Sequence, residues 1–207
     1  MRRILATVVL LALAGCAGSG MEEAECQTAN WRAIGYEDGA RGLSPDAFGA
    51  RRKACAEHGV AAKFGAYQAG HAAGLEVFCD PYNGYRLGTS GYRYGGICPA
   101  HLEGPFLAAH ADGYGLYERQ AALTAIGNQL KYAQARTREI EIQVVDKTAY
   151  LISPVLSPAQ RAATTIELKQ LVEEKATLEA SIPQLERDYA EAERDYESYR
   201  REIAARP

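Results

Sequence analysis

Cysteine is the residue type whose spacing in this chain most directly suggests chemistry, and the chain has five cysteines. Cys16 stands apart from the others, at the end of the box Leu13-Ala14-Gly15-Cys16. Small residues before a cysteine admit a signal peptidase, and the thiol can then accept a diacylglycerol. Arg2 and Arg3 precede an uncharged apolar run from Ile4 to Ala14 that is too short to span a bilayer.

This order of features predicts an exported lipoprotein. Residues 1–15 are expected to be a signal peptide, and residues 16–25 a lipidated N-terminus and short tether. Acyl chains on Cys16 anchor durably, because each buried methylene contributes about 0.8 kcal/mol. Ala17 stands where an aspartate would favour retention at the inner membrane, so we expect the outer membrane, facing the periplasm. The alternative is a buried apolar segment that happens to end in cysteine.

The remaining cysteines predict a disulfide framework, because an even number of cysteines in an exported chain usually pairs. Three pairings are open for these four residues. The alternative is free or metal-bound thiols, but no C-x-x-C spacing is present, so we expect neither a metal site nor a cofactor. The four candidates are Cys26, Cys55, Cys79 and Cys98.

The expected helices favour one of the three pairings. Residues 22–42 are consistent with one helix, and residues 44–58 with a second that Ser44 caps and Gly59 ends. So short a turn makes the two helices antiparallel, which brings the start of the first near the end of the second. This arrangement favours Cys26 with Cys55 and leaves the other two cysteines to close a loop of about 20 residues.

A Tyr-x-x-Gly pattern recurs through the first half of the chain. The first two copies lie in expected helices, where glycines four residues apart let another backbone approach closely. The favoured interpretation is a tight helix–helix contact, and the alternative is a ligand role. The later copies lie between Pro81 and Pro99, where dense turn residues predict a loop or short hairpin and not a helix. The glycines of the expected contact are Gly35, Gly39, Gly70 and Gly74.

The second half of the chain has a heptad pattern, which predicts a coiled coil. The first helix has seam residues Leu116, Leu123, Leu130, Thr137, Val144 and Leu151, with Ile126, Ala133, Ile140 and Lys147. The second has Leu171, Leu178, Leu185, Ala192 and Tyr199, with Leu168, Ile182, Tyr189, Tyr196 and Ile203. We expect an antiparallel hairpin over residues 106–207, with its turn near 152–158 and a kink or brief break at Pro183.

The expected fold class is therefore mainly α: a small disulfide-stapled helical head, residues 26–105, followed by the coiled-coil hairpin. The whole chain has a formal net charge of −3, and its charges are mixed. A mildly acidic chain of this kind offers no electrostatic footprint for nucleic acid.

The sequence contains no motif that indicates catalysis. His58, His71, His101 and His110 form no metal-binding i, i+4 pair, and the known nucleophile and phosphate-loop motifs are absent. We therefore expect a protein that is not an enzyme. Tyrosines could instead stack on sugar rings, which makes glycan binding an alternative. The candidate tyrosines are Tyr82, Tyr85, Tyr92, Tyr94, Tyr114 and Tyr117.

The chain resembles a family of bacterial lipoproteins catalogued as domain of unknown function 2799. The resemblance rests on the lipobox, the segment Trp31 to Gly42, the Tyr67-x-x-Gly70-x-x-x-Gly74 helix and the cysteine framework, over roughly residues 16 to 150. It implies an envelope address and no known activity, so no catalytic residue comes with it.

Three functions remain as hypotheses. The favoured one is a structural or protein-interaction module at the outer membrane, whose hairpin meets another envelope protein or a second copy of the chain. The first alternative is a module that binds peptidoglycan or another glycan through the tyrosines. The second is an enzyme of unrecognised type.

Overall fold

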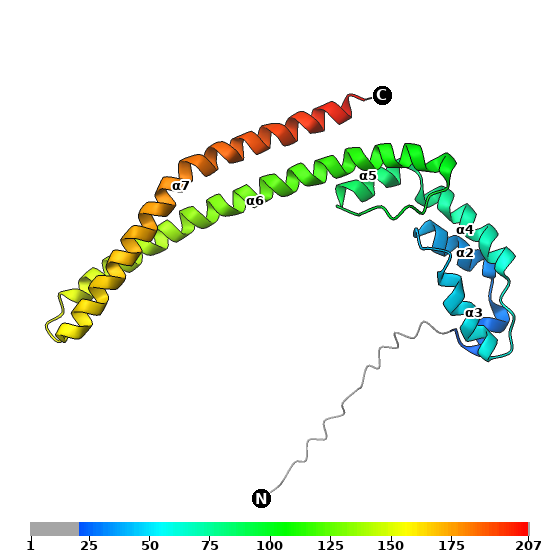
Figure 1. Cartoon of the computed structure of the whole chain (residues 1–207), viewed down its shortest axis with the longest axis horizontal. Helices are drawn as coiled ribbons and strands as arrows, with labels where there is room; N and C mark the ends of the chain where they lie inside the picture. Colours follow the sequence, from blue (N-terminus) through cyan, green and yellow to red (C-terminus); the bar gives the residue numbers. More distant parts are fainter. Residues whose placement is uncertain (1–20, 207) are drawn as a thin grey trace, which may run out of the picture. The chain divides into compact units, whose positions relative to one another are not determined.

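The computed structural model describes residues 21–206, and this part of the chain is helical with no strand (Figure 1). The expected signal peptide and Cys16 lie outside the described residues. No described helix has both the length and the apolar character needed to cross a membrane. The helices are α1 (Glu23–Thr28), α2 (Trp31–Ala40), α3 (Ala47–Glu57), α4 (Phe64–Phe78), α5 (Pro81–Thr89), α6 (Ala100–Leu151) and α7 (Pro158–Ala204).

The described chain divides into two compact units. The first contains residues 21–79 together with Gly96–Leu102, and the second contains Asp80–Gly95 together with residues 103–206. The second unit thus includes α5, although residues 81–89 are expected in the head. α5 joins it because its glycines pack against α6, as described below.

The N-terminal helix of the first unit is shorter than expected. The sequence predicts one helix over residues 22–42, but the helix is interrupted at Ala29–Asn30 and is therefore two helices, α1 and α2. The Asn30 side chain accepts a hydrogen bond from Ala33 N at 3.1 Å, which makes Asn30 the N-cap of α2. Asparagine favours caps over helix interiors because its amide competes for backbone hydrogen bonds, and this preference explains the break.

The third helix begins three residues later than Ser44, the expected cap, because residues 45–46 form a turn before Ala47. The Ser44 hydroxyl still accepts from Asp46 N at 3.3 Å, within that turn. The helix α3 ends where the sequence predicts, because Gly59, which follows it, has a φ of +71°.

The two disulfides of the first unit join Cys26 to Cys55 and Cys79 to Cys98. This is the pairing that antiparallel packing of the first helices favours. Cys26 and Cys55 lie in the same core as Trp31, Phe48 and Tyr67, all at most 5% exposed. The Phe48 ring touches two other rings of that core, with centroid distances of 5.5 Å to Trp31 and 4.9 Å to Tyr67.

The expectation of a loop or hairpin over residues 81–99 is wrong for its first part, because Pro81–Thr89 is helix α5. Asp80 caps the helix by accepting a hydrogen bond from Tyr82 N at 2.8 Å, and Pro81 occupies the first helical position. Gly84 and Gly88 serve close helix packing, whereas Gly91 and Gly96 have φ values of +75° and +74° and lie in turns. Within residues 81–99, only residues 90–99 lie outside helices.

The second unit contains the expected antiparallel hairpin of α6 and α7, with its turn at residues 152–157 (Figure 1). Arms of 52 and 47 residues correspond to about 78 and 70 Å of helix. None of the heptad seam positions is exposed, and Leu116, Ala133, Ile140 and Leu171 are buried. α7 continues through Pro183 without a break.

Ion pairs between the arms fix the hairpin register. Arg136 of α6 donates to both carboxylate oxygens of Glu174 at 2.7 and 3.0 Å, and Lys175 lies 2.9 Å from Glu141. The turn is held by Ser157 and Gln160, which form a capping box at the start of α7. Half-exposed pairs such as these contribute little stability each but define which residues lie opposite one another.

The Cys26–Cys55 disulfide provides a test of whether the two units unfold independently. Replacing both cysteines with serine removes a cross-link that spans 29 residues and is expected to destabilise the first unit by about 3 to 4 kcal/mol. The hairpin should keep its helicity and its unfolding midpoint. Thermal unfolding followed by far-ultraviolet circular dichroism, with tryptophan emission reporting on the buried Trp31, measures both. An equal loss in both signals would mean that the units unfold as one cooperative domain.

Candidate functional site

The closest helix packing in the first unit is the crossing of α2 over α4, and glycines make it possible. A Cβ atom on Gly35 would lie 2.1 Å from Tyr67 O, and one on Gly39 would lie 2.2 Å from His71 O. From the other side, a Cβ on Gly70 would lie 1.9 Å from Arg32 O. These distances exclude any side chain, so the two backbones touch directly. Gly74 is equally close to Tyr36 O, at 2.2 Å.

The second unit repeats this crossing between α5 and α6. A Cβ on Gly84 would lie 2.6 Å from Phe106 O, one on Gly88 would lie 2.3 Å from His110 O, and one on Gly113 would lie 2.2 Å from Tyr85 O. Gly84, Gly88 and Gly113 therefore occupy the places that Gly35, Gly39 and Gly74 hold in the first unit.

The turn that follows the first helix of each crossing is also repeated. Gly42 and Gly91 have φ values of +69° and +75°, and a Cβ on either would lie within 2.5 Å of an aromatic ring, Phe78 or Tyr117. A residue with a side chain would be strained there on both counts.

A histidine of each crossing binds the backbone just after that glycine turn. His71 Nε2 lies 2.7 Å from Leu43 O, and His110 Nε2 lies 2.8 Å from Tyr92 O. Each imidazole also stacks on an aromatic ring one helical turn earlier, with centroids 5.9 Å apart for Tyr67 and 6.1 Å apart for Phe106. The two histidines thus hold the same structural position in the two units.

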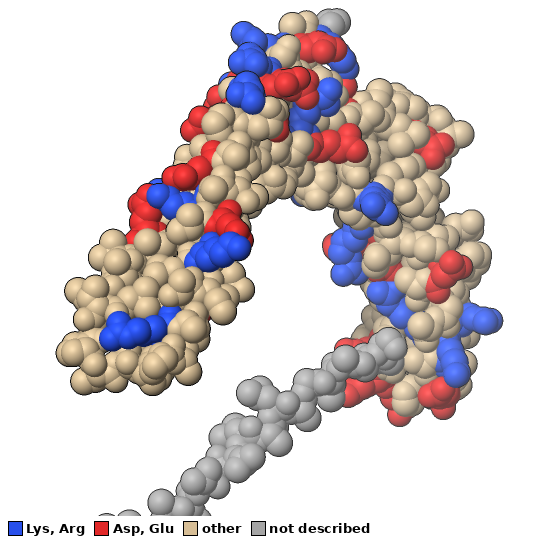
Figure 2. All heavy atoms as spheres, turned by 60° about the vertical axis from the view of Figure 1, so that its left-hand side comes forward, with Lys and Arg blue, Asp and Glu red and all other residues tan. Residues whose placement is uncertain are grey.

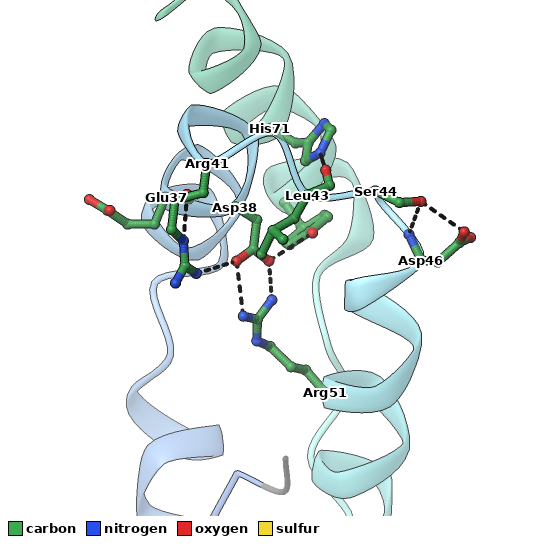
Figure 3. A network of polar contacts seen from close by, with 9 residues as sticks. Glu37, Asp38, Arg41, Leu43, Ser44, Asp46, Arg51 and His71 are labelled. Carbon is green, nitrogen blue, oxygen red and sulfur yellow. Dashed lines mark hydrogen bonds and ion pairs between the residues drawn. The ribbon is translucent and has the colours of Figure 1, made fainter. Parts of the chain in front are cut away.

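The first crossing differs from the second in one buried polar cluster, shown in Figure 3. The Asp38 side chain is 0% exposed. Its carboxylate accepts hydrogen bonds from both terminal nitrogens of Arg51, one of them at 2.9 Å. The Tyr67 hydroxyl donates to the same carboxylate at 2.9 Å, and Arg41 donates to it at 2.9 Å. Arg51 comes from α3, so the cluster ties α3 to the crossing.

The cluster keeps its carboxylate charged. Burial raises the pKa of Asp38, but the hydrogen bonds from Arg51 and Tyr67 and the positive charge of Arg51 outweigh burial and hold the pKa below its usual value. Burial and the neighbouring carboxylate raise the pKa of Tyr67 to about 12. The phenol therefore stays a donor at neutral pH and has no tendency to act as a base.

The second crossing has apolar residues at the equivalent positions. Leu87 stands where Asp38 does, and Phe106, which is 0% exposed, stands where Tyr67 does. The second crossing therefore lacks both the carboxylate of Asp38 and the hydroxyl of Tyr67, so neither group is left buried without the other. This exchange indicates that the aspartate cluster is a way of stabilising the crossing. The sequence signal for the repeat is Gly-Tyr-x-x-Gly-x-x-Gly, at residues 35–42 and 84–91, which extends the recurring Tyr-x-x-Gly pattern by a glycine on each side.

The candidate tyrosines all lie in the second unit, but only some of them come together. Tyr94 packs on Phe106, and Tyr114 packs between His110 and Tyr117, with centroid distances of 5.1 to 5.9 Å. These rings make one aromatic row along the start of α6. Tyr82 is 77% exposed on α5, whereas Tyr85 is partly buried. Tyr92 and Tyr117 are 39% and 41% exposed.

The hairpin has a groove of its own, midway along its arms. It measures about 590 Å³ and is predominantly apolar. Three residues of the heptad seam line it, Ala133, Leu178 and Leu185, together with Tyr132, which is 63% exposed. The groove is lined by Asn128, Gln129, Tyr132, Ala133, Leu178, Ser181, Gln184 and Leu185.

Among the described residues, no three His, Cys, Asp or Glu side chains lie close enough to hold a metal ion. Glu76 and Asp80, two acidic residues at and just after the end of α4, each have another partner. Glu76 lies 3.3 Å from His101 Nε2, and Asp80 caps α5.

Two glycines of α4 form a matched pair for testing the crossing. Gly70→Ala places a methyl group against Arg32 O and is expected to destabilise the first unit by about 2 kcal/mol or more, because two helix backbones must separate. Gly65 has nothing within 4 Å, so Gly65→Ala should stabilise α4 by up to about 1 kcal/mol through helix propensity. Urea unfolding of the two variants measures both effects. Similar values for the two would contradict the close crossing.

The second crossing provides a template for replacing the aspartate cluster. Asp38→Leu alone leaves the Arg51 guanidinium and the Tyr67 hydroxyl without their partner and should cost about 3 kcal/mol. The triple variant Asp38→Leu, Arg51→Met, Tyr67→Phe should recover most of that loss, because Leu87 and Phe106 already occupy the same frame. Urea unfolding at pH 7 compares the three proteins.

The pH dependence of the free energy of unfolding is the control for the comparison of these variants. A lowered pKa means that the Asp38 carboxylate contributes stability above its unfolded pKa of about 3.9, and that this contribution is lost as pH falls through the folded pKa. The wild type should therefore lose stability below about pH 4 more steeply than the triple variant. A triple variant as unstable as Asp38→Leu would show that the polar cluster is not exchangeable.

Comparison with known proteins identifies the segment that contains both crossings. The family described as "Protein of unknown function (DUF2799)" matches residues 30–115, a narrower range than the 16–150 expected. The match begins at the N-cap of α2 and ends in α6 shortly after Gly113. No curated protein and no solved structure matches the chain significantly. Residues 30–115 of the chain therefore match a family whose function is unknown.

Proposed function

We propose that this protein is a cell-envelope lipoprotein that acts as a structural or protein-interaction module, without enzymatic activity. The acylated Cys16 anchors it in the outer membrane, facing the periplasm. The lipobox supports the anchor, and the two disulfides support an oxidising compartment such as the periplasm.

The apolar groove between α6 and α7 is the observation that carries the interaction role. An amphipathic helix can lay its apolar face into such a groove, and a volume of about 590 Å³ accommodates several anchor side chains. The groove places the exposed Tyr132 ring beside the apolar Leu178 and Leu185, and aromatic residues of this kind often dominate binding energy. Its occupant is a helix of another envelope protein or of a second copy of the chain.

In-cell photocrosslinking of the lipidated protein tests this proposal. Photoreactive residues at Gln129, Tyr132 and Gln184 should capture one partner, whereas residues at Arg138 and Thr177, which do not line the groove, should not. Tyr132→Asp, combined with a probe at Gln129, should reduce capture about tenfold or more, because it charges the apolar wall.

Ile142→Asp is the matched control, since Ile142 is equally exposed, at 64%, on the same helix outside the groove. Capture that is equal at all probe positions, or equal in both variants, would refute partner binding in the groove. Metabolic labelling with palmitate should mark the wild type and not a Cys16→Ser variant if Cys16 is the acylated residue. Retention on purified cell-wall sacculi that Tyr82→Ala abolishes, with no protein captured, would favour glycan binding instead.

A further inference from the structure

The end of the hairpin is a second surface, distinct from the groove, and it carries almost no charge. We define the tip as residues 148–166, which contain one charged residue, Arg161. Figure 2 shows this end of α6 and α7 as mostly uncharged, in contrast to the charged arms behind it. Its apolar side chains are strongly exposed: Ile152 by 82%, Val155 by 86% and Ile166 by 60%.

The polar groups of the turn bind one another. The Arg161 guanidinium donates to Leu151 O and to Ser153 O, so the only charge of the tip caps the end of α6. Ser157 N donates to Gln160 Oε1 at 2.9 Å, and Ser153 N donates to Tyr150 O at 3.0 Å. These groups therefore need no water as a partner, which lowers the cost of moving the turn into a less polar medium.

The depth of the uncharged segment matches a shallow membrane insertion. Charge returns on α6 at Asp146 and Lys147, and Lys147 pairs with Glu167 across the hairpin. About 7 Å of helix separates this ion pair from the turn at Ile152. Apolar faces that bind at the bilayer interface are buried by about 5 to 10 Å.

A lipid surface fits these observations better than a protein does. Ile152 and Val155 project from a turn and do not line the groove between α6 and α7, so they offer no cavity for a partner side chain. Arg161 is the one charge of the tip and binds the turn's own carbonyls, so the tip offers little charge to select a partner by complementarity. Leu156, only 8% exposed, points inward and holds the turn while its neighbours stay outside.

We propose that the tip of the hairpin inserts into the interfacial region of a lipid bilayer, with Ile152 and Val155 as the inserted side chains. This site is separate from the lipid anchor and from the groove, and it does not depend on either. The protein then has two membrane contacts, one covalent at its N-terminus and one at the hairpin end.

Vesicle flotation tests the proposal with the full mature chain carrying Cys16→Ser, so that no acyl chain contributes. The vesicles contain phosphatidylethanolamine and phosphatidylglycerol. The Cys16→Ser protein should float with them, and adding Ile152→Glu and Val155→Glu should reduce the bound fraction about tenfold or more. Val172→Glu is the matched control, because Val172 is 53% exposed on α7 outside the tip, and it should bind normally. Binding should change little with salt, since Arg161 is the one charged residue of the tip.

A tryptophan at the tip provides a second readout that does not require loss of binding. The single natural tryptophan, Trp31, is 3% exposed and serves as a constant background. Emission from an Ile152→Trp variant should shift to the blue on adding vesicles and be quenched by lipids brominated near the headgroup.

Three outcomes would overturn the proposal. One is no flotation of the Cys16→Ser protein, and another is equal flotation of the tip and Val172→Glu variants. The third is self-association without lipid that the tip variant abolishes, which would assign the tip to a second copy of the chain.

Discussion

Direct contact between helix backbones is the constraint on which the folded first unit depends. α2 and α4 approach so closely that Gly35, Gly39 and Gly70 cannot carry even a methyl group. The same approach brings Asp38 within hydrogen-bonding distance of Tyr67. Without the glycines the helices would sit further apart, and the buried cluster would lose its geometry. A single steric requirement thus sets the packing and the electrostatics together.

The two crossings show how one frame tolerates different chemistry. The glycines, the left-handed turn and the histidine bound to a backbone carbonyl occur in both, but the buried carboxylate occurs in one. Burying a charged cluster is expensive, and an apolar replacement of similar shape is often as stable. The charged version accompanies α3, which supplies both Arg51 and the Cys55 disulfide. The cluster therefore serves to hold an additional helix.

The hairpin divides its apolar residues among three surfaces with different consequences. The heptad seam is covered by the opposite arm, as an antiparallel coiled coil requires. The groove near Pro183 leaves part of that seam open to a helix, and the tip exposes Ile152 and Val155. Ion pairs such as Arg136 with Glu174 flank the seam and are absent from the tip. The two most exposed apolar side chains of the hairpin, Ile152 and Val155, thus lie where charge is sparse.

The sequence alone determined the helical class, the heptad hairpin with its turn and the favoured disulfide pairing, because periodicity, caps and an even cysteine count are local signals. It also pointed to Gly35, Gly39, Gly70 and Gly74 as packing residues. It misassigned Pro81–Thr89, since glycine has the same type whether it makes a turn or admits a neighbouring helix. Only the tertiary structure distinguished a glycine in a turn from a glycine at a helix contact, because the two differ in what a Cβ atom would meet. The Asp38–Arg51–Tyr67 cluster and the groove likewise join residues distant in sequence, which no local pattern brings together.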